Sequence, residues 1–119
     1  MEAQTIRVVN TTKGTVLGER IGVAETSLGR IVGLLGKTGL EPGTGLLIFP
    51  SQGVHTIAMR FPIDVVFVDR EWQVIHVQPD LVPYRLTGIH WKARGVIELP
   101  AGVIAQTSTS VGDELLIED

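Results

Sequence analysis

The chain has 119 residues, of which 44% are hydrophobic and 19% charged, so it can bury a core and is not a disordered tail. Thirteen acidic residues against ten basic ones give a formal net charge of -3, which argues against a nucleic-acid binder, because such proteins carry a basic excess. The absence of cysteine excludes disulfides, thiolate zinc sites, iron–sulfur clusters and thiol catalysis.

Short strands joined by turns dominate the predicted secondary structure, because runs rich in valine, isoleucine and threonine alternate with glycine and proline. In chain order the predicted strands cover residues 6–9, 16–23, 46–49, 54–61, 63–69, 72–77, 95–99 and 115–117. A turn over residues 10–14 makes a hairpin of the first two. Residues 78–91 contain prolines and have no clear period, so we expect a long loop there.

Two helices are expected. Apolar residues recur at the spacing i, i+3, i+4 and i+7 within residues 26–36, which predicts an amphipathic helix there. Proline is tolerated at the first position of a helix, so Pro100 predicts a short second helix over residues 101–106. The fold class is therefore mainly β (α+β), with a single domain over residues 1–119. We expect an antiparallel or mixed sheet that closes fully or partly into a compact barrel, because closure protects sheet edges.

The strand over residues 63–69 is apolar on both faces, which indicates a central, fully buried strand. Asp64 interrupts it, and a carboxylate removed from water needs a cation, several donors or a proton. Glu98 lies in another apolar run and poses the same question. In one interpretation both acids accept hydrogen bonds near strand ends, from a turn or from an arginine such as Arg60. In another, both acids line one cavity with His55 and Arg60; simple solvent exposure is the third.

Metal and cofactor motifs are not found in the sequence. The three histidines, at positions 55, 76 and 90, lack the spacing of a metal motif, so no metal site is predicted, although His55, Asp64 and Glu98 are geometrically able to form one. The serines lack a nucleophile-elbow setting, and glycine-rich nucleotide-binding motifs do not occur. We therefore predict no cofactor.

Several segments, in this order and spacing, resemble the family of small prokaryotic proteins catalogued as domain of unknown function 192. They are Gly33–Lys37, Leu40–Phe49, His55–Asp69, Val96–Gly102 and Gly112–Asp113. The resemblance runs from about Ala24 to Leu115, nearly the whole chain. It implies a compact β-rich fold, and it brings no established activity.

The resemblance also places six polar or methionine residues within family motifs: Arg30, Met59, Arg60, Asp64, Glu98 and Asp113. This chain departs from many members at Leu35, where they have methionine. It departs again at residues 57–58, where they carry an aromatic pair and this chain has isoleucine and alanine. If that pair lines a pocket in those members, the pocket of this chain is altered.

Our first functional hypothesis is a non-catalytic module that binds a small polar or anionic ligand, or a protein partner. The candidate ligand-binding residues are His55, Met59, Arg60, Asp64 and Glu98. This hypothesis predicts a concave pocket in which polar groups converge.

Two alternatives belong to other classes. The first is a small enzyme in which Asp64 or Glu98 is a general base with His55 nearby, which requires these groups to lie within roughly 3–5 Å of one another. The second is a structural or assembly protein without a ligand site. It predicts buried polar groups satisfied by backbone and an exposed apolar patch around Trp72 or Trp91.

Partners and location are expected only in outline. The N-terminal residues lack the basic and apolar regions of a signal peptide. The longest apolar runs, Leu46–Phe49 and Val65–Val68, are far shorter than the roughly 20 residues that a membrane span needs. We therefore expect a cytoplasmic protein that binds neither nucleic acid nor membrane. The oligomeric state is left open.

Overall fold

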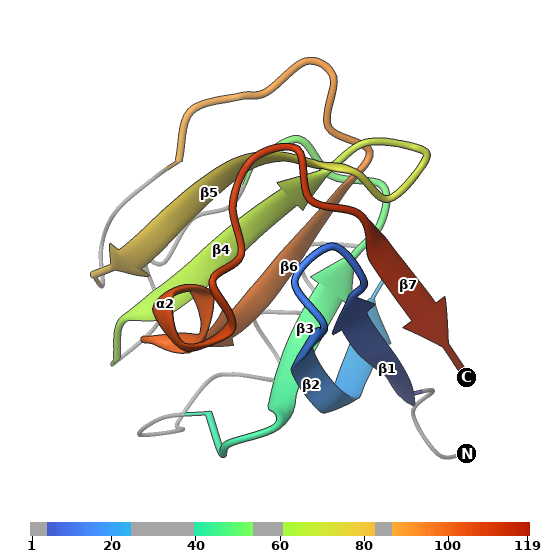
Figure 1. Cartoon of the computed structure of the whole chain (residues 1–119). Helices are drawn as coiled ribbons and strands as arrows, with labels where there is room; N and C mark the ends of the chain where they lie inside the picture. Colours follow the sequence, from blue (N-terminus) through green and yellow to red (C-terminus); the bar gives the residue numbers. More distant parts are fainter. Residues whose placement is uncertain (1–4, 25–39, 54–60, 83–86) are drawn as a thin grey trace.

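The computed structural model describes residues 5–24, 40–53, 61–82 and 87–119 (Figure 1). The strands in these ranges are β1 (Thr5–Asn10), β2 (Thr15–Ala24), β3 (Thr44–Ile48), β4 (Ile63–Val68), β5 (Val74–Leu81), β6 (Gly95–Pro100) and β7 (Leu115–Glu118), and the helix is α2 (Val103–Thr107). The helix predicted over residues 26–36 and nearly all of the strand predicted over residues 54–61 lie outside the described residues.

One mixed sheet contains these strands in the order β5-β4-β6-β3-β2-β1-β7. Of its pairs only β2 with β3 is parallel. The sheet curls so that its two terminal strands approach each other. There Gln73, just before β5, forms an isolated antiparallel β-bridge with Glu114, just before β7. The Val74 N–H adds a hydrogen bond of 2.8 Å to the Asp113 carbonyl. The predicted mainly β fold with a half-closed barrel is thus confirmed.

The prediction of a buried central strand is also confirmed. β4 lies between β5 and β6, and all six of its residues are buried. Its alternating side chains pack into two cores. Val66 and Val68 join the inner core, to which β1, β2, β6, β7 and α2 contribute. Ile63, Val65 and Phe67 join a second core on the outer face.

Most element boundaries differ from the predictions by one or two residues, and the differences at β5 and α2 have a structural cause. β5 continues to Leu81, so the expected loop over residues 78–91 is wrong at its start. Pro79 is tolerated there because β5 is a terminal strand of the sheet, where one side needs no ladder hydrogen bond. α2 begins at Val103 rather than at residue 101, because β6 extends through Pro100 and Gly102 then turns the chain with a left-handed φ of 101°.

The backbones of β3 and β6 approach each other closely at Gly45. A Cβ atom at this position would lie 2.5 Å from the Glu98 carbonyl oxygen and 2.9 Å from Cδ1 of Ile21. The first contact is with backbone, which has little room to move. Only glycine therefore fits at this position of β3.

We predict that Gly45→Ala lowers the free energy of unfolding by about 1–3 kcal/mol, because the added methyl group overpacks the sheet. Gly22→Ala is the matched control, since its Cβ would meet nothing nearer than Leu46 Cδ1 at 3.4 Å. The control should change stability by no more than about 0.5 kcal/mol. Urea unfolding of both variants makes the comparison, and equal losses would contradict the close approach.

Candidate functional site

Two of the five predicted site residues lie in the described part of the chain. Asp64 on β4 and Glu98 on β6 are 1% and 0% exposed. His55, Met59 and Arg60 lie outside the described residues. The expectation that both acids are removed from solvent is therefore met.

The two acids lie on opposite faces of the sheet. In the register between β4 and β6, Asp64 pairs with Leu99 and Val65 pairs with Glu98. Directly paired residues share a face, and consecutive residues alternate, so Asp64 faces the inner core and Glu98 the outer one. The interpretation in which both carboxylates line one cavity is thus wrong. Glu98 instead shares its face with Val65 and Leu46.

Backbone N–H groups hold the Asp64 carboxylate. Oδ1 accepts a hydrogen bond of 2.8 Å from Asp80 at the end of β5. Oδ2 accepts one of 3.1 Å from Gly102 and one of 2.8 Å from Ile104, at the start of α2. Asp64 therefore follows the interpretation in which donors from turns satisfy a buried acid, and it ties two connections to the central strand.

Asp64→Asn should lower the free energy of unfolding by about 2–4 kcal/mol, because the amide NH₂ then faces a backbone donor and a charge-assisted bond is lost. Asp69→Asn is the matched control. One carboxylate oxygen of Asp69 accepts both hydrogen bonds, from the backbone N–H groups of Glu71 and Gln73. The side-chain amide oxygen of asparagine can accept the same two bonds. We expect a change within about 0.5 kcal/mol for the control in the same denaturant titration. An unchanged Asp64→Asn protein would refute the structural role.

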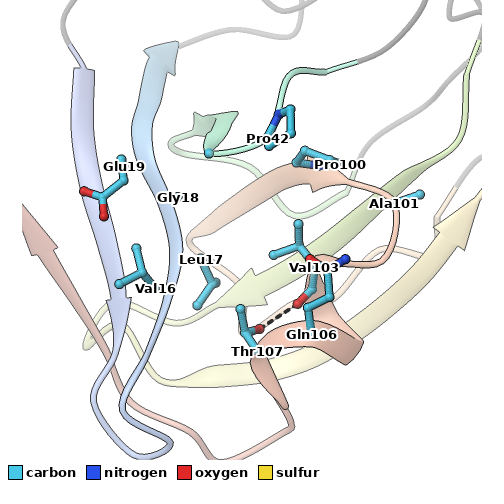
Figure 2. A pocket seen from close by; sticks show the side chains of 11 residues that line it. Val16, Leu17, Gly18, Glu19, Pro42, Pro100, Ala101, Val103, Gln106 and Thr107 are labelled. Atoms are coloured by element: carbon cyan, nitrogen blue, oxygen red, sulfur yellow. Dashed lines mark hydrogen bonds between the residues drawn. The ribbon is translucent and has the colours of Figure 1, made fainter.

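A cleft of about 410 Å³ opens beside α2 (Figure 2). β2 forms one wall, α2 faces it, and Pro42 and Pro100 lie at one end. The lining residues are Val16, Leu17, Gly18, Glu19, Pro42, Gly43, Pro100, Ala101, Val103, Gln106 and Thr107. Of the predicted site residues that the structure describes, neither Asp64 nor Glu98 is in this set. Asp64 nevertheless positions one wall, because it binds the N–H groups of Gly102 and Ile104.

The polar groups of this cleft are few. Among the described lining residues Glu19 alone is charged, and its carboxylate pairs with Arg7 at 2.8 Å. The hydroxyl of Thr107 donates to the Val103 carbonyl at 2.7 Å, and the Gln106 amide lies exposed at the rim. The described part of the lining therefore offers apolar surface with amide and hydroxyl groups, and no pair of acid–base groups occurs among those residues.

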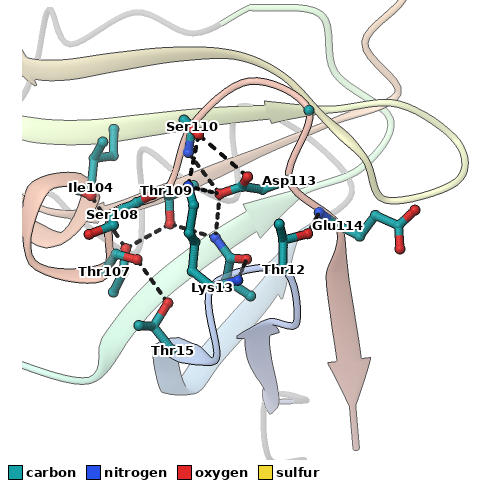
Figure 3. A network of polar contacts seen from close by, with 12 residues as sticks. Thr12, Lys13, Thr15, Ile104, Thr107, Ser108, Thr109, Ser110, Asp113 and Glu114 are labelled. Atoms are coloured by element: carbon teal, nitrogen blue, oxygen red, sulfur yellow. Dashed lines mark hydrogen bonds and ion pairs between the residues drawn. The ribbon is translucent and has the colours of Figure 1, made fainter.

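A second polar cluster joins the β1–β2 turn to the C-terminal segment (Figure 3). Oδ2 of Asp113 accepts hydrogen bonds from Asn10 Nδ2 at 2.9 Å, the Ser110 N–H at 3.0 Å and Lys13 Nζ at 3.1 Å. Thr109 accepts a further bond from Asn10 at 3.1 Å. The resemblance places Asp113 in a family motif, but the sequence did not predict its contacts with Asn10 and Lys13, which are about 100 residues away in the chain.

These contacts change the pKa of Asp113. Burial opposes ionisation, but the hydrogen bonds from Asn10, Ser110 and Lys13 outweigh it and hold the pKa below the ordinary value of 3.8. The ionised carboxylate therefore stabilises the folded chain above the pKa of the unfolded state. This stabilisation disappears as the pH falls through the lower pKa of the folded state.

Asp113→Asn should lower the free energy of unfolding by about 1–3 kcal/mol at pH 7. The difference from the unmodified chain should shrink as the pH falls below about 4, because Asp113 takes up its proton there. Urea unfolding between pH 7 and pH 2 measures it. Glu114→Gln, at the neighbouring exposed acid, should follow the unmodified chain, and a constant Asp113→Asn difference at every pH would contradict the depressed pKa.

Within the described ranges, no three His, Asp or Glu side chains gather in a way that could hold a metal ion. None of the helices within those same residues has both the length and the apolar character to traverse a bilayer.

The comparisons with known proteins agree on one family. The model of DUF192, described as "Uncharacterized ACR", matches residues 8–117. A UPF0127 protein of Thermococcus sibiricus is 31% identical over 116 residues, which cover 91% of this chain and 72% of that protein. A UPF0127 protein of Pyrococcus furiosus is 29% identical over 114 residues, covering 91% and 95%.

A solved structure has the same fold. The crystal structure of a protein of unknown function from Novosphingobium aromaticivorans superposes with a TM-score of 0.78 and covers 96% of this chain and 84% of that one. The identity is 23%, so the likeness extends to the fold alone.

Proposed function

We propose that this chain, which belongs to the DUF192 family, is a non-catalytic module that binds a small, uncharged polar ligand in the cleft between β2 and α2. The observation that carries the proposal is the cleft itself. Its volume of about 410 Å³ lies within the usual range for small-molecule sites, and apolar walls with a few polar groups are typical of such sites. The module binds without transforming its ligand.

The charge of the lining favours an uncharged ligand over an anion. None of the described residues in the lining is a cation that could pair with an anion: its charged residue is Glu19, whose carboxylate pairs with Arg7 at 2.8 Å, and the Arg7 guanidinium also pairs with Glu118 at 2.6 Å. The amide of Gln106 and the backbone of Gly43 serve a neutral ligand equally well as donors or acceptors. We therefore narrow the expected polar or anionic ligand to a neutral one.

Binding is favoured over the enzymatic alternative by the positions of the acids. Both oxygens of Asp64 are engaged by backbone donors and the residue is 1% exposed, so a ligand in the cleft does not reach the carboxylate. Glu98 lies on the opposite face of the sheet and does not line the cleft. Neither acid is therefore placed to act as a general base on a ligand bound there.

A fragment screen by ¹H–¹⁵N chemical-shift changes tests this function. We expect uncharged amides and alcohols to shift the signals of β2 and α2, and their carboxylate analogues to bind at least fivefold more weakly. Ala101→Trp should abolish binding, because the exposed Ala101 side chain lines the cleft and an indole fills it. Ala105→Trp is the matched control, because Ala105 is a nearby exposed alanine on α2 that is outside the lining.

Two outcomes would overturn the proposal. The first is that no fragment binds in a way that Ala101→Trp abolishes and Ala105→Trp leaves unchanged. The other is a stronger response to the carboxylates than to their neutral analogues, which would place the site elsewhere on the chain.

A further inference from the structure

A pinned loop presents an exposed tryptophan on the outer side of β5. The loop is residues 87–94, drawn in orange in Figure 1, where it lies on the far side of β4 and β5 from α2. Gln52 fixes it twice: its carbonyl accepts the His90 N–H at 3.0 Å, and its Nε2 donates to the Trp91 carbonyl at 2.9 Å. The Arg94 N–H donates to Val68 at 2.8 Å. The backbone that carries Trp91 is thus anchored to the sheet.

Two large apolar side chains on this loop are exposed to solvent. Trp91 is 79% exposed and Ile89 is 62% exposed. The chain's other tryptophan, Trp72, is half-buried and stacks on Phe49 with ring centroids 5.7 Å apart. An exposed indole on a well-anchored backbone, next to a second exposed apolar side chain, is typical of a binding surface. The exposed patch expected around Trp72 or Trp91 is therefore at Trp91.

A hollow of about 370 Å³ lies against this tryptophan, and we call it the Trp91 hollow. It is lined by Ile75, Ile89, His90, Trp91 and Lys92. Ile75 belongs to β5 and packs against the outer core, so the hollow lies on the opposite side of the sheet from α2, which packs on the inner core. It is a site separate from the cleft.

The charge of the Trp91 hollow is opposite to that of the cleft. Lys92 is in its lining, and none of the described residues that line it is acidic. His90 stacks on His76 at a centroid distance of 4.3 Å and tilts against Phe67 at 4.4 Å. Burial, and then the neighbouring His76, hold the pKa of His90 below its ordinary value of 6.5. At neutral pH Lys92 is therefore the charge that a ligand meets in this lining.

We propose that the Trp91 hollow binds small aromatic carboxylates, with the aromatic ring against Trp91 and Ile89 and the carboxylate beside the Lys92 ammonium. An indole face and an aliphatic side chain together contact a planar ring. The ammonium selects an anion over a neutral or cationic analogue of the same shape. This ligand class differs from the neutral ligand proposed for the cleft, so each proposal stands without the other.

Three probes of one shape test this selectivity at pH 7: phenylacetate, benzyl alcohol and benzylamine. The indole N–H signal of Trp91 reports binding, and that of Trp72 is an internal reference. We expect phenylacetate to bind with a Kd on the order of 1 mM, as suits a fragment of this size. Benzyl alcohol should bind at least threefold more weakly and benzylamine more weakly still.

Substitutions test which side chains contact the bound probes. Lys92→Glu should weaken phenylacetate binding at least fivefold and change benzyl alcohol binding less than twofold. Trp91→Ala should remove the binding of both probes. Arg20→Glu, at an exposed cation on β2, is the matched control and should leave both affinities within twofold. Amide spectra of each variant confirm that the fold persists.

Any of three results would overturn the proposal. Equal affinity for phenylacetate and benzylamine would remove the role of Lys92. Shifts confined to β2 and α2 would move the site to the cleft. Trp91-dependent binding to vesicles of anionic lipid, or to a second copy of the chain, without phenylacetate binding would make the loop a docking surface.

Discussion

The carboxylate of Asp64 holds together the parts of this protein that surround its cleft. It lies on the central strand β4 and accepts bonds from the end of β5 and from the start of α2. A helix of five residues is too short to be stable alone, so α2 depends on such contacts. A buried carboxylate also needs several donors, and the turns supply them. The acid and the helix therefore stabilise each other.

The other end of α2 is held from the opposite side of the half-barrel. The Thr15 hydroxyl donates to the Thr107 carbonyl at 2.9 Å, and Lys13 Nζ donates to the Ser108 carbonyl at 2.7 Å. These bonds satisfy carbonyls that a helix leaves unpaired at its C-terminus. Lys13 also joins the cluster around Asp113, so the β1–β2 turn and the C-terminal segment fix the helix together. The wall of the cleft is thus positioned at both ends by side chains distant in sequence.

The cleft and the Trp91 hollow differ in the charge of their described lining residues and lie on opposite sides of the sheet. Glu19 is in the lining of the cleft beside α2, and Lys92 is in the lining of the Trp91 hollow. A mostly β chain of this size creates the two sides because its sheet separates an inner from an outer core. The net charge of -3 describes neither hollow, because the local lining decides which ligands are attracted.

The sequence by itself determined the β-rich class, the positions of most strands and the burial of β4. These follow from local pattern, because side chains alternate along a strand and apolar runs must be buried. Only the tertiary structure decided which face each acid occupies, since that depends on the register of β4 with β6. It also decided that Pro79 falls in a terminal strand, and that Lys13 meets Asp113 across 100 positions. The clefts belong to this second group, because their walls come from segments that only the folded sheet brings together.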